Sequence, residues 1–507
     1  MTAAALPDPA TRRLITLTVM AATVMTSLDS TIANVALPHM RGSVGASQEE
    51  ITWALTSFIV ASAITIPLTG WAANRFGRKR VMMLSVLFFT IASALCGVAG
   101  NIGELVGFRV LQGIAGAGLM PLSQAILLDI NPPEQHGQAM ALWGMGAILG
   151  PIVGPVLGGY LTDNYSWRWI FYINVPVGIA AYLGLSAFLS ESKADEVRKL
   201  DFFGFAMLAL AVGTFQLMLD RGQQQDWFTS TEICIEAALA GFFLFAFIVQ
   251  TFTAAQPFID LGLFRDANFV FGCLFGFITG IMLFSVMALL PTLMQQLFGY
   301  PVMLTGIVMA PRGVGSLISM MCVGVFIKVI DMRLLIGGGL ALIAYSMYLM
   351  AGMSLQMDDR LIIISGLFSG LGTGMMFVPL TAVAFGTLPE RYRNEGAAMF
   401  TLIRNLGSAV GISIVQTMTI RSADAAHSQL VEKIRPDNPM LDLRMPGFDF
   451  DAPAAVAMLN GEVTRQAMML SYVNVFTAMF IAALAVIPLV LLLRVTKGGP
   501  QVQIHVE

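Results

Sequence analysis

Long apolar runs separated by short polar segments recur along the whole chain. Runs of about 18 to 25 apolar residues are long enough to cross a bilayer as helices, and this pattern predicts fourteen spans. We place them at roughly 14–37, 51–72, 81–99, 104–127, 139–160, 169–189, 202–219, 233–253, 269–290, 304–327, 334–353, 361–385, 396–420 and 470–494. An even number of spans puts both ends of the chain on one side of the membrane.

Composition supports the same fold class. Of the 507 residues, 56% are hydrophobic and 12% are charged, whereas soluble domains carry about 25% charged residues. The chain is therefore predicted to be an all-α polytopic membrane protein. A net charge of −3, with basic residues confined to short segments, argues against nucleic-acid binding, which needs a broad basic face. The four cysteines lie far apart and predict neither a disulfide framework nor a zinc site.

The distribution of lysine and arginine predicts the orientation. Most of these residues lie in the segments that share a side with the N-terminus, so both termini are expected in the cytoplasm. The first span lacks a cleavage site close behind it and is interpreted as an uncleaved helix. The loop 421–469 is the one large outer segment: AHSQLVEKI looks helical, whereas PDNP and MPGFD look like turns. Two interpretations of this loop stay open, a solvated loop and a docking surface.

Two loose repeats indicate an internal duplication. A proline followed by Gly-x-Ala-Met occurs at Pro121 with 137–140 and again at Pro379 with 396–399. Gly70 with its basic cluster recurs as Gly324 with Lys328 and Arg333. Transporters are commonly built from such repeats, with the binding site between them. We therefore predict an N-terminal six-helix bundle over 1–189, a linker with two inserted helices over 190–260, and a C-terminal six-helix bundle over 261–507.

The first span carries one ionisable group, Asp29. An intramembrane carboxylate is costly unless it faces protein, water or a partner, so it marks an ion or substrate path by default. Small and apolar residues share its helical face, namely Ala22, Met25, Thr26, Ala33 and Ala36. Two interpretations are weighed: a protonatable coupling site, which we favour, and a structural carboxylate paired with an arginine.

Three arginines lie inside predicted spans. Arg109 shares a helical face with Gln112 and Met120, and a guanidinium in the membrane needs a carboxylate, carbonyls or water. Because Asp29 is the one acid well inside the first six spans, we hypothesise that Arg109 lies near it, directly or through water, and biases its protonation. Arg404 and Asn405 are expected to interrupt the thirteenth span. Arg404 either lines the cavity opposite Asp29 or, like Arg312 in the tenth span, reaches toward a helix end or pairs with backbone carbonyls.

Several motifs in order resemble a known family. LDSTIANVALP (28–38), GWAANRFGRKR (70–80), RVLQG (109–113), GPIVGPVLGG (150–159) and WRWIFYINVPVG (167–178) are similar to the fourteen-helix drug:proton antiporters of the major facilitator superfamily. LDRGQQQDWF (219–228) and PFIDLGLFRDANF (257–269) resemble its EmrB-type branch. The resemblance spans nearly the whole chain. It implies a major facilitator fold of two six-helix bundles plus two inserted helices, and multidrug efflux.

The resemblance assigns roles to two further motifs. A cytoplasmic latch is expected at Gly70, Asn74, Arg75, Gly77, Arg78 and Lys79. Asn74 stands where the family has aspartate, so it accepts a hydrogen bond but forms no ion pair, which should weaken the latch. The antiporter motif of the fifth span is Gly150, Pro151, Gly154, Pro155, Gly158 and Gly159. Its four-spaced glycines form a smooth ridge, interpreted either as a pivot between the halves or as simple tight packing.

The resulting expectation is an inner-membrane antiporter that uses the proton gradient, without a cofactor, to export lipophilic compounds. Proton coupling is assigned to Asp29 and Arg109, and a substrate cavity to Met25, Asn34, Gln112, Met120, Arg404 and Asn405. The resemblance also implies a periplasmic adaptor (a membrane fusion protein) and an outer-membrane channel as partners, beside membrane lipids. The alternative is a dedicated exporter of one metabolite or siderophore. A membrane enzyme or a sensor is disfavoured, because neither clustered catalytic side chains nor an output domain is evident.

Overall fold

A computed structural model describes residues 7–132, 135–191, 199–327, 329–435, 448 and 451–493. Within these residues fourteen helical segments are long and apolar enough to cross a membrane, which confirms the predicted number of spans and the all-α class. The first six are α1 (Pro9–Val44), α2 (Gln48–Phe76), α3 (Arg78–Val98), α4 (Ile102–Gly116) with α5 (Leu119–Ile130), α6 (His136–Asn164), and α7 (Trp169–Tyr172) with α8 (Asn174–Phe188). The next two are α9 (Phe202–Arg221) and α10 (Thr231–Thr253). The last six are α11 (Ala267–Thr292), α12 (Val302–Phe326), α13 (Met332–Ala351), α14 (Asp359–Gly386), α15 (Arg393–Val431) and α17 (Pro453–Val486).

Local capping explains where several of these helices begin. The carboxylate of Asp8 accepts hydrogen bonds from the first backbone N–H groups of α1, and Asp266 does the same for α11. Ser47 and Glu50 form a reciprocal capping box at the start of α2. Such side chains satisfy backbone donors that have no partner inside the helix, so the turns between spans can be short.

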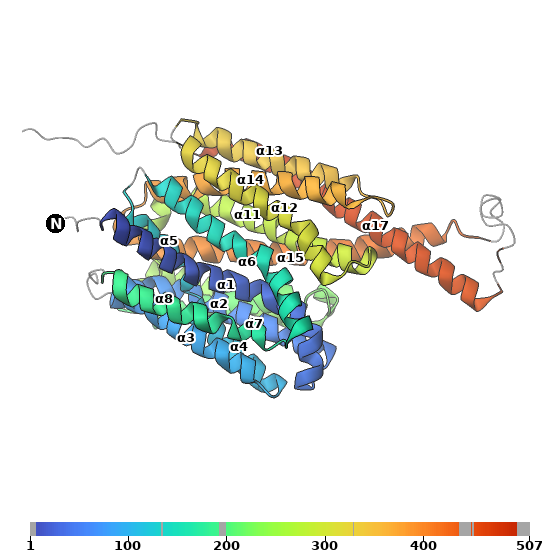
Figure 1. Cartoon of the computed structure of the whole chain (residues 1–507), viewed down its shortest axis with the longest axis horizontal. Coiled ribbons are helices and arrows are strands. Elements are labelled where there is room, and N and C mark those ends of the chain that lie inside the picture. Colours follow the sequence, from blue (N-terminus) through green and yellow to red (C-terminus); the bar gives the residue numbers. More distant parts are fainter. Residues whose placement is uncertain are drawn as a thin grey trace, which may run out of the picture.

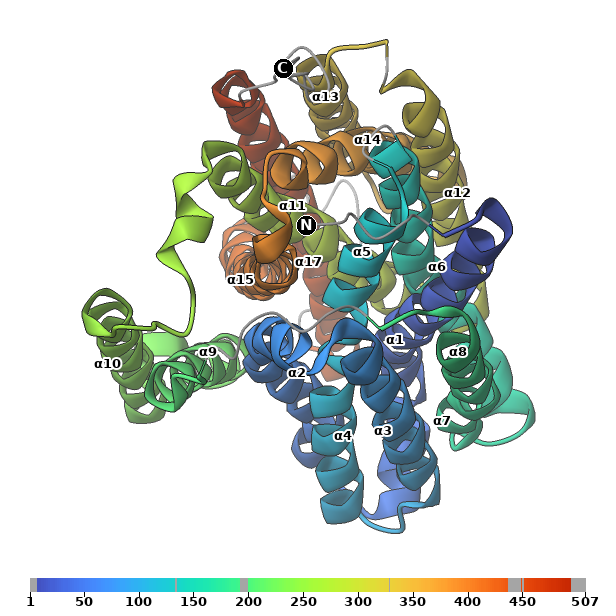
Figure 2. The same cartoon turned by 90° about the vertical axis from the view of Figure 1, so that its left-hand side faces the viewer.

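The helices gather into two groups of six. Helices α1–α8, the N-terminal half, pack mainly on one another, as do helices α11–α17, the C-terminal half (Figure 2). The two groups meet along equivalent seams: Gly70 of α2 lies against Asn394 of α15, and Gly324 of α12 lies against Gln138 of α6. In each case an early span of one half contacts the start of the fifth span of the other half. This arrangement is what two duplicated halves would produce. Lys328, which was predicted to repeat the basic cluster that follows Gly70, lies outside the described residues.

The inserted pair lies at the side of the bundle. Helix α9 packs on α2 and touches α15, whereas α10 packs mainly on α9 (Figure 2). Large apolar side chains of α10 remain exposed, including Phe242, Phe245 and Phe252. Exposed apolar side chains on a membrane-length helix are typical of a lipid-facing surface. The inserted pair therefore covers the α2–α15 seam and leaves the α6–α12 seam uncovered by it.

The last outer segment differs most from expectation. Helix α15 runs for 39 residues to Val431, and α17 begins at Pro453, well before the predicted start near 470. At 1.5 Å per residue α15 is about 58 Å long, against a hydrocarbon core of about 30 Å. Its final turns pack beside the first turns of α17 and form a projecting arm (Figure 1). Most of the predicted loop is thus helical; PDNP and most of MPGFD lie outside the described residues.

Candidate functional site

Asp29 lies in the middle of α1 and is completely buried. The five residues predicted to share its face, Ala22, Met25, Thr26, Ala33 and Ala36, are buried as well. The side of α1 that faces protein was therefore predicted correctly. Burial of a carboxylate in a membrane-spanning helix requires compensating partners, because an unpaired charge in a medium of low dielectric constant is strongly destabilised.

Arg109 of α4 supplies the main partner. Its Nη1 donates to Asp29 Oδ2 at 2.7 Å, and both side chains are no more than 1% exposed. Its Nε donates to the Ala54 carbonyl of α2 at 2.8 Å, and the guanidinium lies 4.2 Å from the centre of the Phe58 ring. The hypothesis that Arg109 lies beside Asp29 is confirmed as a direct contact. Its coupling role stays a prediction.

Two amides complete the shell around the carboxylate. Gln112 and Asn174 each donate to Asp29 Oδ1 at 2.8 Å. The Gln112 amide oxygen accepts from Arg109 Nη1 at 2.8 Å, so this side chain bridges the ion pair. Asn174, the first residue of α8, also donates to Ser93 Oγ of α3 at 3.0 Å. Side chains of α4 and α8 thus contact the acid of α1 directly, and α3 joins them through Ser93.

Sequence reasoning missed Asn174 and Ser93. Asn174 lies within the quoted motif WRWIFYINVPVG, so a polar residue at the start of an apolar span was the available signal. Ser93 carries no such signal, because a serine inside a helix often bonds to its own backbone. Here its hydroxyl donates to the Phe171 carbonyl of α7 at 2.9 Å instead.

Arg404 occupies a different environment in the C-terminal half. Helix α15 passes through Arg404 and Asn405 without a break, so the predicted interruption is wrong. The guanidinium carbon lies 5.7 Å from the Trp143 ring centre of α6 and 5.9 Å from that of Phe377 of α14. Those two rings stack at 5.8 Å across the boundary between the halves. Among the described residues, the buried Nε of Arg404 has no hydrogen-bond acceptor.

Arg312 contacts a backbone carbonyl, as predicted for it. Its Nη2 donates to the Leu283 carbonyl of α11 at 3.3 Å, whereas its buried Nη1 has no acceptor within the described part of the chain. A backbone carbonyl compensates a buried guanidinium less completely than a carboxylate does. The C-terminal half therefore holds two buried arginines that form no ion pair with any described residue.

The remaining residues assigned to the cavity are scattered. Met25 and Gln112 are buried, Met120 and Asn405 are half-buried, and Asn34 is exposed. The helix that was expected to run through Arg109 and Met120 breaks at Ala117–Gly118, so Met120 lies on α5. The structure brings Gln112 to Asp29. The roles of these residues as substrate contacts stay predictions.

The glycine ridge of α6 faces the first helix rather than the other half. Gly146, Gly150, Gly154 and Gly158 lie against Met20, Ser27–Leu28, Thr31 and Ile32 of α1, with too little room for a Cβ. Thr31 Oγ1 donates to the Gly150 carbonyl at 3.2 Å. The interpretation of this ridge as the pivot between halves is therefore wrong, and tight packing within one half accounts for it.

The contact between halves uses the other side of α6. There, Ile152 and Val156 fill space left by Gly313 and Gly306 of α12. The helix continues through Pro155, and Gly159 is buried. The side chain of Pro151 lies outside the described residues. The smooth surface at this seam thus belongs to α12, whose glycines were not predicted to form it.

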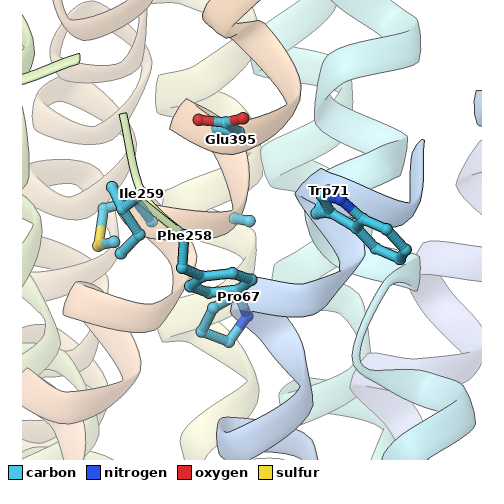
Figure 3. A pocket seen from close by; sticks show the side chains of 7 residues that line it. Pro67, Trp71, Phe258, Ile259 and Glu395 are labelled. Carbon is cyan, nitrogen blue, oxygen red and sulfur yellow. The ribbon is translucent and has the colours of Figure 1, made fainter. Parts of the chain in front are cut away.

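The predicted latch joins the halves at the end of the bundle where α1 begins. A Cβ on Gly70 would lie 3.0 Å from the Glu395 Cα, and Asn394 of α15 donates to the Asn74 side chain. Asn74 thus accepts a hydrogen bond, as expected. A small pocket beside this contact is lined by Pro67, Trp71, Phe258, Ile259, Glu395, Ala398 and Met399 (Figure 3).

The basic residues of the latch contact groups outside the latch motif. Arg78 forms an ion pair with Asp129 near the end of α5, and Arg393 of α15 donates to the same carboxylate at 2.9 Å. Lys79 donates to the Ser186 carbonyl of α8 at 2.9 Å. Gly77 adopts φ +87° between α2 and α3, a conformation that favours glycine, and Arg75 is half-buried. Asp129 thus supplies the charge between the halves that Asn74 lacks.

Comparisons with known proteins agree with this architecture. The family model described as Major Facilitator Superfamily matches residues 19–412. The chain is 36% identical over 468 residues to the multidrug export protein EmrB of Escherichia coli strain K12, covering 91% of each chain. It is 33% identical over 484 residues to the fatty acid resistance protein FarB of Neisseria gonorrhoeae, covering 95% of this chain and 96% of the relative. The solved structure of the proton:xylose symporter XylE superposes with a TM-score of 0.60 at 14% identity, covering 95% and 97% of the two chains, which is a likeness of fold alone.

Proposed function

Because this chain belongs to the major facilitator superfamily, we propose that it is a proton-coupled antiporter that exports lipophilic drugs and other toxic compounds. It is a multi-pass membrane transporter. The similarity to EmrB over nine-tenths of the chain supports multidrug export as its activity. We place it in the bacterial inner membrane with both termini in the cytoplasm, because lysine and arginine gather on the side of the termini.

The observation that carries the proposal is the buried pair of Asp29 and Arg109. A titratable acid inside a membrane-spanning helix, held by a permanent cation, can exchange a proton when the surrounding helices move. Each proton that moves inward is worth about 2.3 kcal/mol per 100 mV of membrane potential. The gradient therefore supplies the energy for export, and no cofactor is part of the proposal.

Arg404 is proposed to recognise substrate. It lies between aromatic rings from both halves, and its Nε lacks an acceptor within the described residues. A guanidinium in such a place suits a negatively charged or polar group on an otherwise apolar molecule. The name of the relative FarB, a fatty acid resistance protein, is in line with amphipathic acids among the substrates. Met25, Asn34, Gln112, Met120 and Asn405 are proposed to complete the path.

The projecting arm of α15 and α17 is proposed as the place where a periplasmic adaptor docks. The two helices of the arm are longer than the hydrocarbon core requires (Figure 1). His427 of α15 lies 3.0 Å from the side-chain oxygen of Asn460 of α17. A helical arm with internal contacts offers a more defined surface than a solvated loop. An outer-membrane channel would complete the export path through such an adaptor.

Efflux of a fluorescent drug in everted vesicles tests the proposal. Asp29→Asn should abolish drug transport and the accompanying collapse of the pH gradient. Thr23→Val on the same helix should change neither, because the Thr23 hydroxyl bonds to the Val19 carbonyl within α1. Unimpaired coupled transport by a folded Asp29→Asn protein contradicts the coupling role.

A panel of unrelated toxic compounds separates multidrug export from the alternative. A multidrug exporter raises the tolerance of cells to several chemical classes, whereas a dedicated exporter of one metabolite or siderophore changes tolerance to one. Tolerance to a single compound would favour the dedicated exporter on the same fold.

A further inference from the structure

The hydrogen bonds around Asp29 all point the same way. Arg109 donates to Oδ2 at 2.7 Å, and Gln112 and Asn174 each donate to Oδ1 at 2.8 Å. An ionised carboxylate accepts hydrogen bonds and donates none, whereas a protonated one must donate its own proton. The three donors therefore form the hydrogen-bond pattern that suits an ionised carboxylate.

The guanidinium charge of Arg109 fixes the orientation of two of these donors, its own N–H groups and the Gln112 amide. Arg109 has no acceptor atom, so its direction cannot reverse. Gln112 is held because its oxygen accepts from Arg109 Nη1 at 2.8 Å and lies 3.6 Å from Cys96 Sγ. Reversing the Gln112 amide would place its N–H groups against the guanidinium. Asn174 has no such neighbour and needs another reason to present its NH₂ group to the acid.

That reason begins at a backbone carbonyl. The Phe171 carbonyl can only accept, and it takes the hydroxyl proton of Ser93 at 2.9 Å. With its proton used, Ser93 Oγ offers lone pairs to Asn174, whose Nδ2 lies 3.0 Å away. The same Nδ2 carries a second hydrogen, which it donates to Asp29. The order of donation therefore runs from Ser93 to the Phe171 carbonyl, and from Asn174 to both Ser93 and Asp29.

We propose that Asn174, oriented by Ser93 and the Phe171 carbonyl, is the positioning residue that sets the pH at which Asp29 takes up a proton. Asn174 and Ser93 carry no proton themselves. They connect the start of α8 and the middle of α3 to the acid of α1, so the ionised form is favoured as long as α8 stays against α1. The inference rests on the proposed coupling role of Asp29.

Few other ionisable groups face the acid. Arg109 comes from α4, and the Cys96 thiol comes from α3 behind Gln112. The described contacts from α2 and α7 are the Ala54 carbonyl and the Phe58 and Phe171 rings beside the guanidinium. Asn174 is the contribution of α8, and no ion pair links Asp29 to α5 or α6 within the described chain. Changes at Asn174 should therefore appear in the titration of Asp29 alone.

The test follows the pH dependence of drug efflux and, on purified protein, the infrared carboxyl band that Asp29→Asn removes. Asn174→Leu keeps the branching of the side chain at Cγ but removes the donor, so the midpoint of both titrations should move to higher pH by about one unit or more, because a hydrogen bond to a charged group is worth that much. Ser93→Ala should move it less in the same direction. Thr23→Val, a buried hydroxyl change on α1, should leave it in place.

The outcomes separate this inference from the coupling role itself. If Asp29→Asn abolishes coupling while Asn174→Leu and Ser93→Ala both titrate like Thr23→Val, the role of Asn174 is refuted and the coupling role stands. A shift to lower pH in either variant also refutes it. If Asn174→Leu fails to fold, Ser93→Ala alone decides, since it leaves Asn174 in place. If Asp29→Asn transports normally, the coupling role fails first.

Discussion

Arg109 and Arg404 are both buried arginines in membrane-spanning helices, yet their surroundings differ. Arg109 contacts a carboxylate, an amide oxygen and a backbone carbonyl, all from its own half. Arg404 lies near two aromatic rings, one from each half, and its Nε lacks an acceptor within the described residues. The first environment is complete without a ligand. The second is the kind of place that a substrate can complete.

The comparison also locates the movement that coupling requires. Asp29, Arg109, Gln112 and Asn174 all belong to the N-terminal half, so a rigid tilt of one half against the other leaves their distances unchanged. A local shift within the half is needed to release the acid. The break between α4 and α5 at Ala117–Gly118 lies two turns beyond Arg109 and is a suitable hinge. Arg404, in contrast, responds directly to tilting, because Trp143 lies across the boundary.

The largest effect is expected from removing one member of the pair. Arg109→Gln leaves the Asp29 carboxylate buried without its cation, which costs about 3–5 kcal/mol of unfolding free energy. Adding Asp29→Asn to the same chain should recover much of this loss, because the uncompensated charge is then gone. Thermal unfolding of the purified proteins in detergent measures both. Equal stability of Arg109→Gln and the unaltered protein would show that the pair is not the compensated unit described here.

Arg404→Gln should separate function from stability. Because Arg404 has no carboxylate partner among the described residues, its removal should leave the thermal midpoint unchanged or slightly higher. Export of an amphipathic acid should fall about tenfold, the size expected for one hydrogen bond to a charged group. Export of a neutral lipophilic compound serves as the internal control. A proportional loss for both compounds would argue against charge recognition, and a large loss of stability would argue against an open site.

The smallest effect is expected at the end where α1 begins. Asp129 contacts Arg78 of its own half and Arg393 of the other, with about a third of its side chain exposed. Such accessible ion pairs are worth about 0–1 kcal/mol, so Asp129→Asn should shift the balance between conformations without unfolding the protein. In a cysteine-free background, a thiol introduced at buried Ala398, beside the pocket of Figure 3, should react faster with a maleimide. Asp163→Asn is the control: Asp163 lies near the end of α6, at the opposite end of the bundle from Asp129, and its substitution should not change that rate.

Much of the fold follows from local pattern. Apolar runs of membrane length predicted all fourteen spans, and the small residues around Asp29 predicted which side of α1 is buried. The boundaries of α15 and α17 were missed because hydropathy reports the part of a helix that lies in lipid. The polar turns of the arm are stabilised by the neighbouring helix instead, and no hydrophobicity pattern marks them.

The candidate site divides in the same way. That an acid and an arginine inside spans should meet could be inferred from the sequence, since each is too costly alone in a low-dielectric interior. The sequence also showed that α6 has a glycine ridge. Three contacts depend on how distant helices are placed in space. They are the helix that packs on that ridge, the acid that pairs with the latch arginine, and the amide that donates to Asp29. Those contacts join residues 51 to 145 positions apart, so only the tertiary structure decided them.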